Sequence, residues 1–162
     1  MERIAKAART SKERVYAHFR SKEELYRFVA ARELEAMATA VPLDAADLPG
    51  YAVRVHDHVV QHPQRMRLMQ WGQLEMTPSP RDDPFRLIVE DKIEQLRRAQ
   101  DAGILDKRWD PKDVLVFVSQ LATSWAGQSG LVPAGPERDE FLASRRQAIQ
   151  AAVQQPFPAA AR

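Results

Sequence analysis

The stretch "TSKERVYAHFRSKEELYRF", from Thr10 to Phe28, predicts two helices joined by a tight turn. Ser11 occupies an N-cap position ahead of a helix over about residues 12–19, where its hydroxyl can accept a bond from a free backbone N–H. The sequence "SKEE", from Ser21 to Glu24, has the spacing of a capping box, so a longer helix is expected to begin there and to end before Pro42. The nine preceding residues predict one more short helix.

Apolar residues at helical spacing predict which faces of these helices turn inward. Val15 and Phe19 lie four residues apart and therefore share one face of the second helix. Ile4, Ala5 and Ala8 share one face of the first helix. We expect these side chains to form a small core.

The composition of the 162-residue chain indicates an all-α protein with a buried core. No stretch alternates apolar and polar residues as a half-buried strand does. Hydrophobic residues make up 44% and charged residues 28%, which argues against disorder. The chain has no cysteine, which excludes disulfides, thiolate metal sites and a cysteine nucleophile. No apolar run approaches the roughly 18 residues that span a bilayer, so we expect a cytoplasmic protein with no membrane partner and no cofactor.

The net charge of +2 conceals an uneven distribution. Residues 1–22 contain seven basic and two acidic side chains, so this segment carries +5 and the other 140 residues carry −3. A compact positive end on a mildly negative body is typical of a nucleic-acid contact. A solvated basic helix face with no partner would have the same composition.

Five longer helices are expected after the sequence "VPLDAADLPG", which covers residues 41–50 and contains two prolines and one glycine. Their expected ranges are about 51–62, 63–74, 85–102, 111–125 and 137–155, with loops at 77–84 and 130–136. The helix over 111–125 has apolar residues on most sides, so we expect it to be largely buried.

The sequence "IAKAARTSKERVYAHFRSKEELYRFV" resembles the helix-turn-helix signature of the tetracycline-repressor (TetR) family of bacterial transcriptional regulators. The matching positions are Ile4, Ala5, Ala7, Ala8, Ser11, Val15, Tyr16, His18, Phe19, Ser21, Lys22, Glu23 and Leu25. The resemblance implies an all-α fold with three parts. Residues 1–41 would be the DNA-binding head with its connecting helix, 42–155 a helical regulatory and dimerisation domain, and 156–162 a frayed tail.

Two departures from the family pattern concern the head. The family usually has glycine and then valine in the turn, where this chain has Arg9 and Thr10. We expect Arg9 to adopt the left-handed conformation that glycine takes freely, at a cost of about 1–2 kcal/mol. The family also has a helix ahead of the position of Ile4 that packs across the other two. The resemblance therefore implies a gene product that extends beyond Met1, and weakened DNA binding by the present chain.

The resemblance places the helix over residues 12–19 in the major groove of DNA. Lys12, Glu13 and Ala17 would meet base edges, while basic and aromatic neighbours would reach phosphates. Tyr16 and His18 could instead pack between helices. The complete expected DNA-binding set is Ser11, Lys12, Glu13, Arg14, Tyr16, Ala17, His18 and Lys22.

The resemblance further implies a cavity for a small-molecule effector and a homodimer. The expected cavity residues are Met66, Gln70, Trp71, Leu74, Phe85, Ile88, Phe117, Gln120, Leu121 and Trp125, each of which could instead belong to an ordinary core. The expected dimer residues are Phe141, Arg145, Ala148, Ile149 and Ala152.

We therefore predict a ligand-responsive repressor that binds palindromic double-stranded operator DNA as a dimer and is released by a small-molecule effector. The alternative is an all-helical, ligand-binding dimer whose head no longer binds DNA specifically. An enzyme is not expected, because the chain has no paired acid–base constellation, glycine-rich phosphate loop or serine elbow. His58 and His62 have a spacing that could hold zinc but lack a third ligand, so no metal is expected.

Overall fold

The computed structural model describes residues 1–75, 83–128 and 130–159, and this part of the chain forms eight helices and no strand. The prediction of an all-α fold is confirmed. The helices are α1 (Glu2–Ala7), α2 (Lys12–His18), α3 (Lys22–Ala40), α4 (Leu48–Gln61), α5 (Pro63–Glu75), α6 (Pro84–Asp101), α7 (Pro111–Thr123) and α8 (Arg138–Gln154). The loop expected at residues 77–84 falls almost entirely outside the described residues.

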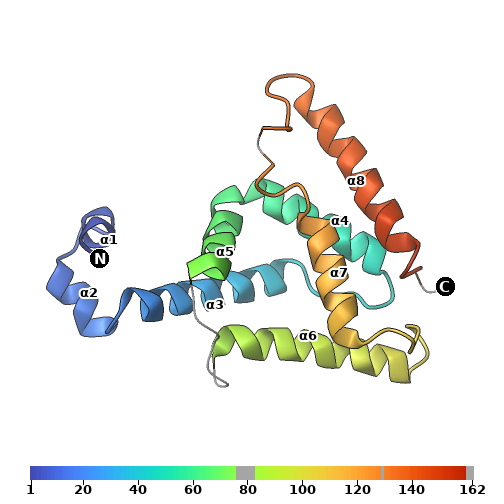
Figure 1. Cartoon of the computed structure of the whole chain (residues 1–162), viewed down its shortest axis with the longest axis horizontal. Coiled ribbons are helices and arrows are strands. Elements are labelled where there is room, and N and C mark those ends of the chain that lie inside the picture. Colours follow the sequence, from blue (N-terminus) through green and yellow to red (C-terminus); the bar gives the residue numbers. More distant parts are fainter. Residues whose placement is uncertain (76–82, 129, 160–162) are drawn as a thin grey trace.

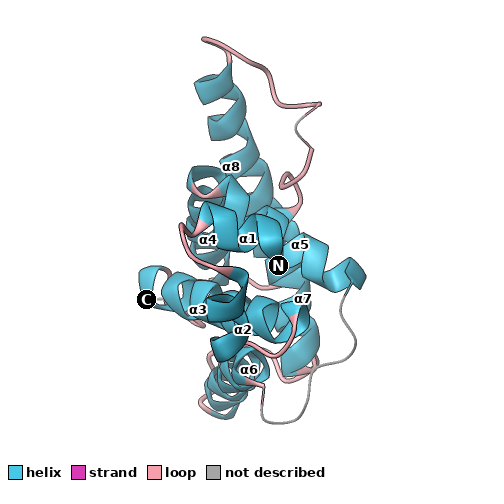
Figure 2. Ribbon diagram, turned by 90° about the vertical axis from the view of Figure 1, so that its left-hand side faces the viewer, coloured by secondary structure: helices cyan, strands magenta, loops and turns pink. Residues whose placement is uncertain are grey.

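The long helix α3 connects a small head to a larger helical body (Figure 1). Helices α1 and α2 lie at the N-terminal end of α3, away from the body, and face the viewer in Figure 2. The remainder of α3 packs against α5 and α6. Helix α4 packs against α7 and α8, which places it at the centre of the body.

The hydrophobic core surrounds α4. Tyr51, Ala52 and Val55 of this helix are each at most 2% exposed. Buried residues of α6, α7 and α8 close the core around them, namely Leu96, Val114, Leu115, Val118, Ala122, Ile149 and Val153. Each large side chain contributes roughly 1.5–3 kcal/mol on burial, so the body supplies most of the stability of the chain.

Aspartate residues begin three of the body helices. Asp47, Asp83 and Asp110 each accept a bond from a backbone N–H of the following turn, at 2.8–2.9 Å. A proline follows each cap within two residues, where its missing N–H costs nothing. The cap at Asp47 explains why α4 begins at Leu48, three residues before the position expected from the sequence.

Two expectations about burial are wrong. Val116 and Phe117 of α7 are 52% and 44% exposed, because α4, α6 and α8 pack on other sides of this helix. Phe157, in the tail that was expected to fray, is only 4% exposed, whereas residues 160–162 of that tail lie outside the described residues. Its ring lies 5.3 Å from the ring of Trp109, so an aromatic contact fixes a segment that was expected to fray.

Candidate nucleic-acid interface and regulatory cavity

The turn between α1 and α2 contains the left-handed residue that the sequence predicts. Arg9 has a φ of 51° and is the one non-glycine residue with positive φ in the described part of the chain. Its N–H donates to the carbonyl oxygen of Lys6 at 3.2 Å, and the N–H of Thr10 donates to that of Ala5 at 3.0 Å. This pair of bonds is a Schellman motif, so Arg9 occupies a position that normally favours glycine.

Helix α2 begins at the predicted N-cap. The Oγ of Ser11 accepts a hydrogen bond from the backbone N–H of Arg14 at 3.2 Å. Hydrogen bonds from its own backbone N–H and from the Ser11 hydroxyl lower the pKa of the exposed Glu13 carboxyl. Glu13 is therefore an ionised acceptor on the outer surface of α2.

The capping box at the start of α3 is also present. Ser21 Oγ accepts from the N–H of Glu24 at 3.0 Å, and Glu24 Oε2 accepts in return from the N–H of Arg20 at 2.7 Å. The return bond thus reaches the residue before the N-cap. Both bonds fix the angle at which α3 leaves the head, and so the orientation of α2.

All eight residues expected at DNA lie on the surface of α2 and at the start of α3. Tyr16 is 45% exposed and His18 is exposed, so neither is buried between the helices of this chain. The exposed set consists of Ser11, Lys12, Glu13, Arg14, Tyr16, Ala17, His18 and Lys22.

The core expected within the head is only partly closed. Ala5 is buried, but Val15 and Phe19 are half-buried and Ile4 remains 37% exposed. The ring of Phe19 lies 5.4 Å from that of Phe28, which is itself 50% exposed. Two short helices and the first turns of α3 bury too little surface to enclose these side chains.

Helix α5 holds the N-terminal half of α3 through aromatic contacts. The Lys22 Nζ lies 4.4 Å from the ring centroid of Trp71, and the Tyr26 ring lies 5.3 Å from the same indole. Gly72 is buried directly against Tyr26. Burial, and to a smaller extent the charge of Asp83, raises the pKa of the Tyr26 hydroxyl, which therefore stays neutral.

Ion pairs hold α3 on two sides. Arg65 of α5 contacts Glu33 at 2.8 Å. Arg27 contacts Asp83, the buried N-cap of α6, at 3.6 Å. Because α3 is held by both neighbours, a shift of α5 or α6 would be passed to the head.

The body contains a cavity of about 840 Å³. It lies between α4, α5, the start of α8 and the chain that leads from α7 to α8. Three of the expected cavity residues meet there: Met66, Gln70 and Trp125. Gln70 is fixed by a bond from its Nε2 to the carbonyl oxygen of Ala126 at 3.3 Å.

His56 of α4 also lines this cavity, although the sequence did not indicate it. The residue is 2% exposed, and its Nδ1 lies 3.3 Å from the carbonyl oxygen of Ala122. Burial lowers the pKa of the imidazole, partly opposed by this hydrogen bond. No sequence pattern marks the position, because a histidine on the inner face of a helix is identified only by its burial.

The other expected cavity residues lie elsewhere. Trp71 packs on α3, Leu74 is 85% exposed, and the Phe117 ring packs edge-on against Trp109 at 5.9 Å. Phe85 is half-buried at the start of α6, Gln120 is exposed on α7, and Leu121 packs against the core.

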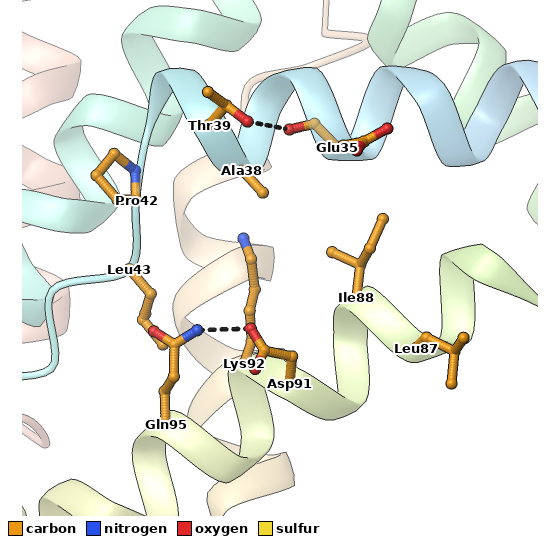
Figure 3. Close-up of a pocket in the computed structure, with 10 residues that line it drawn as sticks. All are labelled: Glu35, Ala38, Thr39, Pro42, Leu43, Leu87, Ile88, Asp91, Lys92 and Gln95. Carbon is orange, nitrogen blue, oxygen red and sulfur yellow. Dashed lines mark hydrogen bonds between the residues drawn. The ribbon is translucent and has the colours of Figure 1, made fainter.

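Ile88 lines a separate groove of about 440 Å³ between α3 and α6 (Figure 3). Ile88 and Lys92 both point from α6 toward α3 in this view. Lys92 is 7% exposed, and its Nζ donates to the Tyr51 hydroxyl oxygen of α4 at 3.0 Å. The groove is therefore lined by α3, by the segment that follows α3 and by α6, and its residue Lys92 connects it to α4 through Tyr51.

The expected dimer residues divide between the interior and the surface of the chain. Ile149 is 3% exposed and belongs to the core. Phe141 packs edge-on against Trp125 at 5.3 Å, and the Arg145 guanidinium lies 4.8 Å from both rings. The remaining two, Ala148 and Ala152, are exposed on α8.

The described residues offer neither a metal site nor a membrane span. The rings of His58 and His62 lie 4.6 Å apart, but no group of three or more possible metal ligands forms within the described ranges. None of the described helices combines the length and apolar character required to cross a membrane.

Two family models match the chain, and together they cover most of it. The model of bacterial regulatory proteins of the tetR family matches residues 1–29, and the tetracyclin repressor-like C-terminal domain matches residues 47–155. The chain is 28% identical over 128 residues to the HTH-type transcriptional repressor SCO4008 of Streptomyces coelicolor. This match covers 78% of the chain and 66% of that repressor, slightly less than two thirds of its length.

A solved structure is also similar. The crystal structure of a proposed transcriptional regulator, SCO4942 of Streptomyces coelicolor, is 44% identical with a TM-score of 0.75. The similarity covers 98% of this chain and 86% of that one. Both relatives are named as regulators, in agreement with the expectation that the chain is not an enzyme. The chain belongs to the tetR family of bacterial regulatory proteins.

Proposed function

We propose that this chain is a transcriptional repressor that binds palindromic operator DNA as a homodimer and is released by a small-molecule effector. The main support for the proposal is that α2 is capped, held at a defined angle and exposed on the surface of the head. The helix is capped by Ser11 and oriented by the capping box at Ser21, and every residue expected at DNA is exposed on α2, at its N-cap or at the start of α3. The name of the relative SCO4008, an HTH-type transcriptional repressor, supports the same direction of regulation.

DNA recognition would divide between base and phosphate contacts. Lys12, Glu13 and Ala17 face base edges, where an ionised Glu13 accepts a bond from a cytosine amino group. Arg14 and His18 reach phosphates, which supply affinity rather than sequence discrimination. The Lys22 ammonium group lies over the Trp71 ring, which restricts its position. It would therefore contact a phosphate from a defined position.

The dimer would form through α7 and α8. Val116 and Phe117 form an exposed apolar patch on α7, and the small side chains of Ala148 and Ala152 permit close approach on α8. A two-fold axis through this surface would present two α2 helices to half-sites about 34 Å apart.

Helix α5 provides the connection between effector and DNA. Its residues Met66 and Gln70 line the cavity, whereas Arg65, Trp71 and Gly72 contact α3. A ligand that prefers one position of α5 would shift the population of α3 orientations and so the separation of the two α2 helices.

The alternative function is ligand binding by a dimer whose head does not recognise specific DNA. The partly open core of the head favours it, since Phe28 is 50% and Ile4 37% exposed. Selection from a random duplex library with the full chain separates the two functions. Enrichment of one palindrome supports the repressor, whereas recovery of unrelated sequences at equal affinity supports the alternative.

A further inference from the structure

The 840 Å³ cavity between α4, α5 and α8 has the volume and the walls of a small-molecule site. Sites for drug-sized ligands span about 300–1,000 Å³ and are lined mostly by apolar side chains with a few polar groups. Here Val59, Met66, Trp125 and Phe141 provide apolar walls. Flat or branched apolar groups pack well against such aromatic and thioether surfaces.

His56 supplies a buried hydrogen-bond acceptor that finds no partner among the described residues. Its Nδ1 lies 3.3 Å from the Ala122 carbonyl oxygen, which can only accept, so Nδ1 carries the proton. In the neutral ring the lone pair is then on Nε2, which is buried without a partner in the described part of the chain. Leaving such an acceptor unsatisfied is unfavourable, so the site is complementary to a ligand that donates a hydrogen bond.

The charges at the cavity have one sign. Arg67 of α5 and Arg138 of α8 line it, and no aspartate or glutamate does among the described residues. Both arginines are exposed, and no ion pair joins either of them to an acidic side chain within the described part of the chain. Two guanidinium groups beside an apolar cavity favour an anionic group such as a carboxylate, which arginine can bind with two parallel bonds.

We propose that the cavity binds an apolar, anionic small molecule that carries a hydroxyl group, which donates to His56 Nε2 while the anion meets Arg67 and Arg138. The proposal rests on the effector role under the proposed function, and it defines the chemical class of that effector. Aromatic hydroxy acids are the simplest members of the class.

Isothermal calorimetry of the full chain with three matched compounds tests the proposal in the absence of DNA. The compounds are 6-hydroxy-2-naphthoate, its methyl ether 6-methoxy-2-naphthoate, and 2-naphthol. The hydroxy acid is expected to bind at least about tenfold more tightly than the ether, which cannot donate, and than the naphthol, which has no carboxylate. Equal binding of all three, or no binding at about 1 mM, would overturn the proposal.

Two variants on the same helix identify the acceptor. Asparagine at position 56 in His56→Asn can still donate to the Ala122 carbonyl but does not reach the position of Nε2. We expect this variant to bind the hydroxy acid about tenfold more weakly than the unaltered chain does, and to bind the hydroxy acid and the methyl ether with equal affinity. The control is His58→Asn. The Nε2 of His58 is also buried with no partner in the described ranges, but this residue lines a different, 40 Å³ cavity against α3 and α5.

Binding of the hydroxy acid should stay within twofold in His58→Asn. A loss of equal size in both variants would contradict the assignment to His56. Thermal denaturation of each variant shows whether it folds, and the hydroxyl-to-ether comparison on the unaltered chain tests the acceptor even if His56→Asn does not fold.

The double substitution Arg67→Gln and Arg138→Gln tests the anion. It should weaken the binding of both naphthoates at least about tenfold and leave the binding of 2-naphthol unchanged. An equal loss of affinity for all three compounds would contradict an anionic ligand. Failure of this inference is distinguishable from failure of the proposed function. Binding without release of DNA would remove the effector role, and specific DNA binding with no compound bound would leave the repressor but remove this ligand class.

Discussion

Gly72 of α5 lies so close to Tyr26 of α3 that a Cβ at the glycine would stand 1.5 Å from the tyrosine hydroxyl oxygen. The two helices can approach in this way only because residue 72 has no side chain. The contact joins the helix that lines the cavity to the helix that carries the head. The packing of Gly72 against Tyr26 therefore bears both on the stability of the chain and on the proposed regulation.

The substitution Gly72→Ala should reduce the stability of the chain. The added methyl group forces the rigid Tyr26 ring from its place beside Trp71, and overpacking of this kind costs about 1–3 kcal/mol. Urea denaturation followed by tryptophan fluorescence measures the loss. The matched control is Gly130→Ala, since a Cβ there has no neighbour within 4 Å; equal losses in the two variants would contradict the packing argument.

Arg9→Gly should stabilise the head. The φ of 51° costs an arginine about 1–2 kcal/mol that glycine does not incur, and the larger freedom of glycine in the unfolded chain returns part of it. We expect the stability of the head to rise by about 0.5–1 kcal/mol in total, which would slow hydrogen exchange at the Thr10 amide. Ala8→Gly, at a residue with a φ of −82°, should instead speed exchange. A faster Thr10 amide in Arg9→Gly would be the opposite result.

The chain should lose stability as the pH falls below about 6.5. Burial lowers the pKa of His56, and that of His58, so the unfolded chain takes up protons first. The stabilisation is complete above the unfolded pKa near 6.5 and is lost as the pH falls through the folded value. The charged neighbours of His56, Asp57 and Arg146, are paired with each other at 2.6 Å. Urea denaturation at pH 7.5 and 5.5 measures the change.

The variant His56→Asn should flatten this pH dependence, with a remainder from His58. An unchanged dependence in this variant would show that His56 is protonated equally in the folded and unfolded states.

Arg14→Ala should weaken binding to every duplex by a similar factor. Loss of one phosphate contact reduces the slope of log K against log salt by about 1. Fluorescence anisotropy at several salt concentrations measures both effects. Arg98→Ala is the control, because this side chain is 75% exposed near the C-terminal end of α6, a helix that packs against α3 and α7 rather than against α1 or α2. A change of equal size in the control would place the DNA contact elsewhere.

Features that depend on a few neighbouring residues could be predicted from the sequence. The caps at Ser11 and Ser21 and the left-handed Arg9 are of this kind, since each follows from hydrogen bonds within one turn. Helix ranges also follow from local spacing. The expected start of α4 lies three residues too late, because the N-cap is Asp47 and not a residue next to Tyr51.

Positions that depend on distant contacts could not be predicted. Trp71 and Trp125 are both aromatic residues on or beside helices, but one packs on α3 and the other lines the cavity. His56 is defined by the carbonyl of Ala122, 66 positions away in the chain. Phe157 follows the last helix and still reaches the core through Trp109. Periodicity gives the face of a helix but not the element that covers it.

The central claim is that α2 reads operator DNA. Its most direct test is the affinity of the full chain for a palindrome obtained by library selection, compared with a scrambled duplex of equal composition, by anisotropy at near-physiological salt. We expect binding to the palindrome to be at least about 1,000-fold tighter, and a Lys12→Ala and Glu13→Ala double variant to lose much of this preference. Equal affinity for both duplexes would contradict the proposal that α2 recognises operator DNA, if the double variant also leaves the slope of log K against log salt unchanged.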